Sequence, residues 1–181
     1  MGTWKFDPMH LQVEFSAKHL GMMTVRGHFT EVNATGDLYP DQPERSKVDV
    51  TINTASIRTH NEQRDNDLRS SYFLEIDKYP AITFKSTKIE ANSKDKGTMI
   101  GELTIKGVTK PVTLNVVRYG EFNDPGMGHR IAFAAETKIN RQDYNMKFDA
   151  MLDGKFVVSH DIQINIEGEL LEAKEPAKVA S

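Results

Sequence analysis

The chain has 181 residues, and its 26 acidic and 23 basic side chains leave a formal net charge of −3. This length suits one domain, and the absence of cysteine excludes disulfide scaffolds, thiol nucleophiles and cysteine-ligated zinc or iron–sulfur centres. A hydrophobic fraction of 38% and a mean hydropathy of −0.51 argue against fibrous and membrane-spanning proteins. The acidic balance, without any run of arginine and lysine, argues against a nucleic-acid partner.

The N-terminal residues carry no secretory signal. Residues 1–6 lead directly to Asp7 and Pro8, with no apolar run of signal-peptide length. The sequence as written therefore predicts a cytoplasmic protein with no transmembrane segment, or a periplasmic one if a leader has been removed.

Alternation of apolar and polar residues is the main structural signal along the chain. One-sided alternation predicts antiparallel strands with one buried and one wet face. Turn residues at 94–97, 106–111 and 123–126 separate neighbouring runs as hairpins. Long strands in hairpin order favour closure into an extended eight-stranded antiparallel β-barrel, since closure removes exposed edges. The predicted strands lie near residues 11–17, 24–39, 48–53, 81–89, 99–105, 112–116, 131–135 and 162–167.

One short surface helix is predicted over residues 61–72. Asn61 can cap it, Glu62 suits its first turn, and Asp65 is placed to pair with Arg69 four residues on. A second short turn is expected at 141–147. We assign residues 1–171 to a single barrel domain and residues 172–181 to a flexible C-terminal tail.

No catalytic or metal-binding motif emerges from the histidines and hydroxyls. The helical segment from His60 lacks a second histidine at the spacing that zinc proteases need. Ser159, His160 and Asp161 hold the residue types of a catalytic triad, but the middle residue of a strand points away from its neighbours. We therefore predict no catalytic residue, no metal site and no cofactor.

Two features of the sequence each allow two interpretations. The charged cluster Arg64, Asp65, Asp67 and Arg69 is either a clamp for a ligand headgroup at a barrel mouth or a self-paired helix surface. Inward-facing aromatic residues of an eight-stranded barrel either fill its interior or line a tunnel for a long apolar molecule. The sequence pattern favours the self-paired helix surface in the first case and the filled interior in the second. The large aromatics concerned are Phe15, Phe29, Phe84 and Phe133.

Several segments, in order along almost the whole chain, resemble the YceI-like family. One departure from the family pattern is Asn145, which follows the aromatic residue Tyr144 at a position where family members often carry glycine. The matching segments are residues 4–10 (WKFDPMH), 13–15 (VEF), 19–20 (HL), 56–59 (SIRT), 61 (N), 64–65 (RD), 68–70 (LRS), 73 (F), 79–84 (YPAITF), 101–112 (GELTIKGVTKPV) and 139–144 (INRQDY).

The resemblance implies a lipocalin-like barrel with a long apolar tunnel that binds polyisoprenoid lipids, including prenyl diphosphates and isoprenoid quinones. It also implies homodimers, periplasmic members and roles in lipid transport, antibiotic sequestration or stress responses. With this resemblance the tunnel becomes the favoured interpretation. The expected tunnel lining is Val13, Phe15, Phe29, Phe84, Leu103, Leu114, Phe133 and Ile164, and the expected headgroup contacts are His10, His19, Arg64 and Arg69.

Three functional hypotheses follow. The first is non-enzymatic binding, transport or sequestration of a long isoprenoid-type lipid. The second is an enzyme acting on the headgroup of such a lipid, and the third is a ligand-free barrel that works through a protein partner. A bound lipid separates the first two from the third, and turnover of that lipid separates the second from the first.

Overall fold

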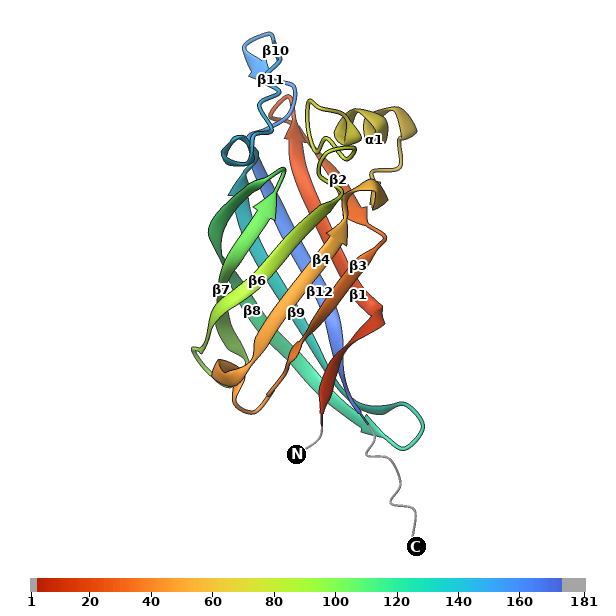
Figure 1. Ribbon diagram of the computed structural model, residues 1–181, viewed down its shortest axis with the longest axis vertical. Coiled ribbons are helices and arrows are strands. Elements are labelled where there is room, and N and C mark those ends of the chain that lie inside the picture. The colour runs from red at the N-terminus through yellow and green to blue at the C-terminus, as the bar shows by residue number, and fades with distance from the viewer. Residues whose placement is uncertain (1–2, 174–181) are drawn as a thin grey trace, which may run out of the picture.

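The computed structural model describes residues 3–173. Long antiparallel strands curl into an elongated barrel-like sheet, with a single α-helix at one end (Figure 1). We call this end, which carries α1 (Glu62–Arg69) and the turn between β1 (Trp4–His19) and β2 (Met23–Phe29), the upper end. Strand β1 begins and strand β12 (Asp161–Glu172) ends at the opposite, lower end. No helix among the described residues is long and apolar enough to span a bilayer.

The all-β antiparallel architecture predicted from alternation is confirmed, whereas the strand count differs. Three short 3₁₀ helices, η1 (Pro43–Arg45), η2 (Thr54–Ser56) and η3 (Arg141–Tyr144), lie between strands. The strands are β1 (Trp4–His19), β2 (Met23–Phe29), β3 (Val32–Asp37), β4 (Lys47–Asn53), β5 (Ile57–Arg58), β6 (Ala81–Ala91), β7 (Lys96–Ile105), β8 (Val108–Asp124), β9 (Gly128–Asn140), β10 (Met151–Leu152), β11 (Lys155–Phe156) and β12 (Asp161–Glu172).

The main sheet has ten strands in the order β3-β4-β6-β7-β8-β9-β12-β1-β2-β5, in place of the eight expected. The run expected as one strand at 24–39 is interrupted at Thr30 and Glu31, and its two halves pair with different partners. Strand β2 pairs with β1, and β3 pairs with β4 near the other edge of the sheet. Because this one segment joins both edges and β1 lies beside β3, the sheet curls around an interior. The two-residue strand β5 pairs with β2 and supplies the tenth strand.

The hairpins follow local turn chemistry. Lys106 and Gly107 join β7 to β8 with φ values of 48° and 76°, the positive pair that a two-residue hairpin turn requires. The hairpin predicted at 94–97 turns slightly earlier, since β7 already begins at Lys96. Asn145 has φ 60° and ψ 15°, the left-handed conformation that glycine and asparagine adopt most readily, so asparagine can replace the glycine expected there.

The predicted helix and its cap are present, but one predicted ion pair is not. The Asn61 side chain accepts a hydrogen bond from the Arg64 backbone N–H and caps α1. Asp65 is buried and accepts from the backbone and the hydroxyl of Thr59, while the Arg69 guanidinium donates to the backbone carbonyl of Ile57. Buried backbone donors and acceptors need partners, and the helix side chains satisfy them instead of pairing with each other. The self-paired interpretation of this cluster is therefore wrong for Asp65 and Arg69.

The C-terminal boundary also differs from the prediction. Glu172, expected in the flexible tail, is the last residue of β12 and pairs with Trp4. Of the expected tail, residues 174–181 lie outside the described residues.

Candidate functional site

The barrel encloses a cavity of about 980 Å³ that extends along most of its length. Its wall is formed mainly by inward-facing aliphatic and aromatic side chains from every long strand of the main sheet. Ligand cavities of drug-sized molecules have volumes of about 300–1,000 Å³, so the space suits one large apolar ligand.

All eight side chains expected to line a tunnel lie on this wall. Val13, Leu103 and Leu114 are buried, whereas Phe15, Phe29, Phe84, Phe133 and Ile164 remain partly accessible although they face inward. Residues that fill a close-packed core leave almost no accessible surface. The interior is therefore hollow, as the tunnel interpretation expects, and the aromatics line it.

Glycines on neighbouring strands explain why the phenylalanine rings do not fill the interior. Phe15 is directly opposite Gly27, and Phe133 is directly opposite Gly168. A Cβ built on Gly27 would lie 2.4 Å from the Phe15 ring, and one on Gly168 would lie 2.8 Å from the Phe133 ring. The rings therefore lie flat over glycine backbone and stay at the wall. Analysis of single strands missed this signal because each pair spans two strands.

The cavity wall is polar at its upper end only. The apolar lower part contains Phe6, Met99 and Val116. Charged side chains reach this wall from α1 and from the start of η3: Arg64, Asp67 and Arg141. Glu14, Lys18 and Arg26 also border the cavity, but they alternate with the inward residues of β1 and β2, so their side chains lie on the exposed outer face. A molecule with an apolar tail and a polar head thus has one favourable orientation, because burying a polar group without a partner is costly.

Arg141 is the most deeply buried cation at this end, with 1% of its surface exposed. Its guanidinium donates to the backbone carbonyls of Met146, Val158 and Ser159 at 2.7, 3.0 and 2.9 Å. Burial lowers the pKa of this guanidinium, and the nearby Asp149 carboxylate opposes that shift. Arg141 therefore holds the segment 146–159 against the top of β9.

Two segments meet over the upper end. The Phe148 ring lies 5.2 Å from the Phe73 ring and 6.0 Å from the Tyr72 ring, centre to centre. His19 Nδ1 donates to the carbonyl of Val157 at 3.0 Å, which ties the same segment to the end of β1. The chain that follows α1 and the chain that follows η3 thus form the upper cavity wall together.

The four expected headgroup residues do not come together. His19 and Arg64 lie on the cavity wall at the upper end. Arg64 donates through Nε and Nη2 to the hydroxyl and the carbonyl of Thr59. Arg69 lies off the wall, where it donates to backbone carbonyls of η2 and β5, and His10 lies near the lower end of β1. The cation that sequence analysis missed at this end is Arg141, because a strand pattern cannot place a side chain of η3 beside a helix distant in sequence.

Comparisons with known proteins match this fold and its cavity. The model of the YceI-like domain matches residues 4–170. Protein YceI of Escherichia coli O17:K52:H18 is 40% identical over 162 residues, which cover 90% of this chain and 83% of the relative. The chain belongs to the YceI-like family.

Solved structures support the same assignment. The Campylobacter jejuni YceI protein superimposes with a TM-score of 0.75 and 36% identity, covering 87% of this chain and 90% of the other. A domain from Saccharophagus degradans, described as polyisoprenoid-binding and implicated in plant cell wall breakdown, superimposes with a TM-score of 0.67 and 15% identity. That match covers 96% of this chain and all of the other, and at this identity it supports the fold alone.

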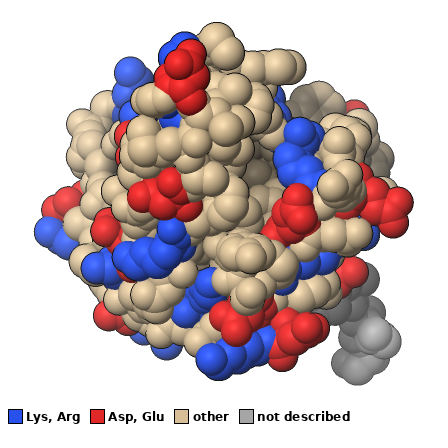
Figure 2. Space-filling view, turned by 90° about the horizontal axis from the view of Figure 1, so that it is seen from above, with Lys and Arg blue, Asp and Glu red and all other residues tan. Residues whose placement is uncertain are grey.

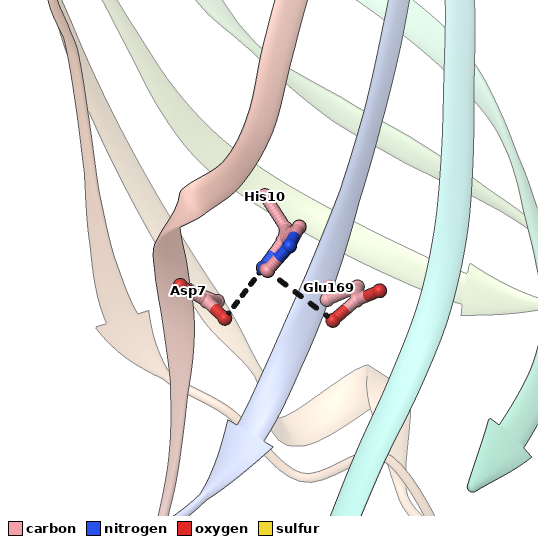
Figure 3. A group of neighbouring side chains, drawn as sticks. All are labelled: Asp7, His10 and Glu169. Atoms are coloured by element: carbon pink, nitrogen blue, oxygen red, sulfur yellow. Dashed lines mark hydrogen bonds and ion pairs between the residues drawn. The ribbon is translucent and has the colours of Figure 1, made fainter. Parts of the chain in front are cut away.

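At the lower end of the YceI-like barrel, Asp7, His10 and Glu169 face one another (Figure 3). His10 Nδ1 lies 2.9 Å from Asp7 Oδ2 and 3.8 Å from Glu169 Oε2. Arg130 Nη1 approaches the same two carboxylates at 2.5 and 2.8 Å. The donor set could suit a cation, but the guanidinium already pairs with both acids. We therefore assign the group to an ion-pair network.

This network stabilises an irregularity in β1. Between the pairs Phe6–Leu170 and Leu11–Gly168, residues 7–10 of β1 lie opposite the single residue Glu169 of β12, and the Met9 backbone N–H donates to Asp7 Oδ1. Hydrogen bonds from His10 and Arg130 lower the pKa of the Asp7 carboxyl to about 2. His10 has this structural role at the end opposite the polar mouth.

A second ion-pair group lies beside it. His129 Nδ1 is 2.6 Å from Glu172 Oε2, and His129 Nε2 contacts the Glu121 carboxylate. The hydrogen bonds to Glu172 and Glu121 raise the pKa of His129, and its ring packs edge-on against Trp4. The group joins the ends of β1, β8, β9 and β12.

Ser159, His160 and Asp161 form no catalytic relay in this YceI-like chain. The Ser159 hydroxyl donates to the backbone carbonyl of Asp161, whereas His160 Nε2 pairs with the Asp149 carboxylate at 2.6 Å. Ser159 and His160 lie just before β12 and not within a strand, as the sequence analysis assumed, and their contacts with Asp161 and Asp149 keep them apart.

Proposed function

We propose that this chain binds one isoprenoid lipid, with its tail along the lower cavity and its polar head at the upper end. The observation that supports this proposal most directly is the polarity gradient of the cavity. The wall is apolar over the lower part, and every charged wall residue lies in the upper half. Membership of the YceI-like family and the fold shared with a domain described as polyisoprenoid-binding support this ligand class.

The gradient favours a long flexible chain over a compact ligand. Each methylene group removed from water contributes about 0.8 kcal/mol. A chain that reaches Phe133 contacts apolar wall along the whole barrel, whereas a short ligand leaves the lower part unused. Partly accessible rings on the wall gain contact only when a ligand covers them.

The upper end suits a headgroup with acceptor oxygens. Arg64 supplies a cation at the mouth, and Asp67 is the acidic wall residue of α1 there. Prenyl diphosphates and isoprenoid quinones both carry such oxygens, and we propose these two headgroup classes for test.

We further propose binding, for transport or sequestration, and not turnover. Nucleophilic catalysis needs a nucleophile with a base in hydrogen-bond reach. The wall histidine, His19, uses Nδ1 for a backbone carbonyl, and the triad-like residues engage other partners. A homodimer and the compartment stay predictions, which light scattering and cell fractionation test.

The deciding experiment is native mass spectrometry of the purified chain, followed by organic extraction of whatever is bound. The extract is compared with titrations using prenyl diphosphates and isoprenoid quinones of increasing chain length. We expect one lipid per chain, affinity that rises with tail length until the cavity is full, and recovery of chemically unchanged lipid.

A matched pair of variants tests the orientation. Arg64→Gln removes a charge from the mouth, whereas Arg118→Gln removes one from β8, where Arg118 pairs with Glu121 outside the cavity wall. Only Arg64→Gln should weaken the binding of a prenyl diphosphate. Affinity that does not depend on tail length contradicts the tunnel. Protein-dependent conversion of the lipid contradicts the carrier function and shows that the protein is an enzyme.

A further inference from the structure

Three separate segments meet at the upper end of the barrel (Figure 1), and each exposes large apolar side chains. The β1–β2 turn presents Met22 and Met23, the β10–β11 hairpin presents Met151 and Leu152, and the chain after α1 presents Tyr72. Their exposed fractions range from 52% to 69%. Exposed apolar groups gathered at one place mark interaction sites more often than scattered ones do.

The exposed side chains are continuous with the cavity. Met23 and Tyr72 belong both to the cavity wall and to this exposed set. An apolar surface therefore leads from the interior to the outside of the barrel without a polar barrier at these two residues. We name the five residues Met22, Met23, Tyr72, Met151 and Leu152 the apolar rim.

The charges around the apolar rim do not select a partner of one sign. On the segments that carry the apolar rim or lie next to it, Lys18 and Lys155 are matched by Asp67 and Asp153. Figure 2 looks onto this end and shows blue and red side chains interspersed around its edge, with other residues between them. A partner bound here is recognised by apolar contact and not by a strong field.

We propose that the apolar rim docks this end of the barrel onto the surface of a lipid bilayer, from which the cavity takes up its ligand. This proposal rests on the proposed lipid-binding function. A lipid-borne ligand must leave a bilayer, and the continuity of the rim with the cavity lets its tail move between two apolar environments. Side chains at turn tips can enter the boundary between headgroups and acyl chains while the barrel stays in water.

The test is flotation with phosphatidylcholine vesicles, with and without added phosphatidylglycerol. Met22→Asp/Leu152→Asp changes the rim at two residues that do not line the cavity. Met9→Asp/Met127→Asp makes the same change in charge at the lower end, where the exposed fractions are 86% and 59%. We expect the rim variant to bind vesicles about tenfold more weakly, which corresponds to ~1.4 kcal/mol. The lower-end variant should bind as the unmodified chain does.

A second measurement separates docking from ligand binding. Isoprenoid quinone is supplied either in the vesicles or in detergent, and loading of the protein is followed by native mass spectrometry. The rim variant should load about tenfold more slowly from vesicles, in line with its weaker vesicle binding, and normally from detergent. Loss of loading from both sources in the unmodified chain contradicts the proposed function. Normal loading from detergent without any vesicle binding contradicts the docking proposal but not the proposed lipid binding.

Three further outcomes overturn docking by the apolar rim. Equal flotation of both variants shows that the rim is not the contact. Binding that needs phosphatidylglycerol and disappears in salt shows electrostatic adsorption. Concentration-dependent self-association that only the rim variant abolishes, without vesicle binding, shows that the rim contacts a second copy of the chain.

Discussion

Gly168 lets the Phe133 ring lie against the wall, and we expect this to set how far the tail of the proposed lipid can reach. In Gly168→Ala the new Cβ would lie 2.8 Å from Phe133 Cζ and 3.0 Å from Leu11 Cδ1. Carbon atoms pack at about 3.5–4.0 Å, so the ring has to move by about 1 Å. The strand backbone lies behind the ring, and the cavity is the free space into which it can move.

The displaced ring should remove room for about one methylene group at the lower end of the cavity. We expect about fourfold weaker binding, ~0.8 kcal/mol, for prenyl chains long enough to reach Phe133. Shorter chains should bind as before. The free energy of unfolding should fall by about 1–3 kcal/mol, as overpacking usually causes. The assays are a titration series over chain length and unfolding in urea.

Two variants serve as controls for this prediction. Gly120→Ala changes a strand glycine whose added Cβ meets no atom within 4 Å, and it should leave binding and stability nearly unchanged. The double variant Gly168→Ala/Phe133→Leu removes the ring and should restore binding of long chains, with coupling between the two sites. Equal weakening of all chain lengths, or no restoration by Phe133→Leu, refutes the ring-displacement argument.

The remaining predictions concern stability and pH. Leu114→Asp places a charge without a partner in the buried wall, so it should lower the free energy of unfolding by several kcal/mol or prevent folding. Asn165→Asp on the exposed face should change that free energy by no more than about 0.5 kcal/mol. Urea unfolding measures both variants, and equal effects contradict the one-sided sheet. The lowered pKa of Asp7 stabilises the folded state by about 2 kcal/mol above pH 4, and this stabilisation is lost as the pH falls towards 2. Asp7→Asn should therefore be less stable at pH 6, and its unfolding curve should approach that of the unmodified chain near pH 2. Because the pKa of His129 is raised in the folded state, His129 stabilises the fold below its ordinary pKa of 6.5, and this stabilisation is lost as the pH rises through the pKa in the folded state. NMR titration should find that pKa above 6.5. In His129→Gln, the free energy of unfolding should depend less on pH above 6.5.

Local patterns in the sequence were sufficient for the inward face of the long strands, for the hairpin between β7 and β8 and for the helix cap. Burial on one side imposes a period of two, so the inward position of Val13, Leu103 and Leu114 follows from alternation. The left-handed turn at Lys106 and Gly107 and the cap at Asn61 depend only on residues a few positions away. These features could be predicted because the interactions that create them are short in sequence.

Only the tertiary structure decided whether the inward aromatics fill or line the barrel. That outcome depends on strand register, which brings Gly27 opposite Phe15 and Gly168 opposite Phe133. The break at Thr30 and Glu31 likewise follows from the need to join both edges of a curled sheet. Alternation sets the face of each side chain within one strand, but pairing across strands sets which atoms meet. The residue pattern of each strand therefore predicts its inward face, and the pairing register between strands determines that these faces enclose a cavity.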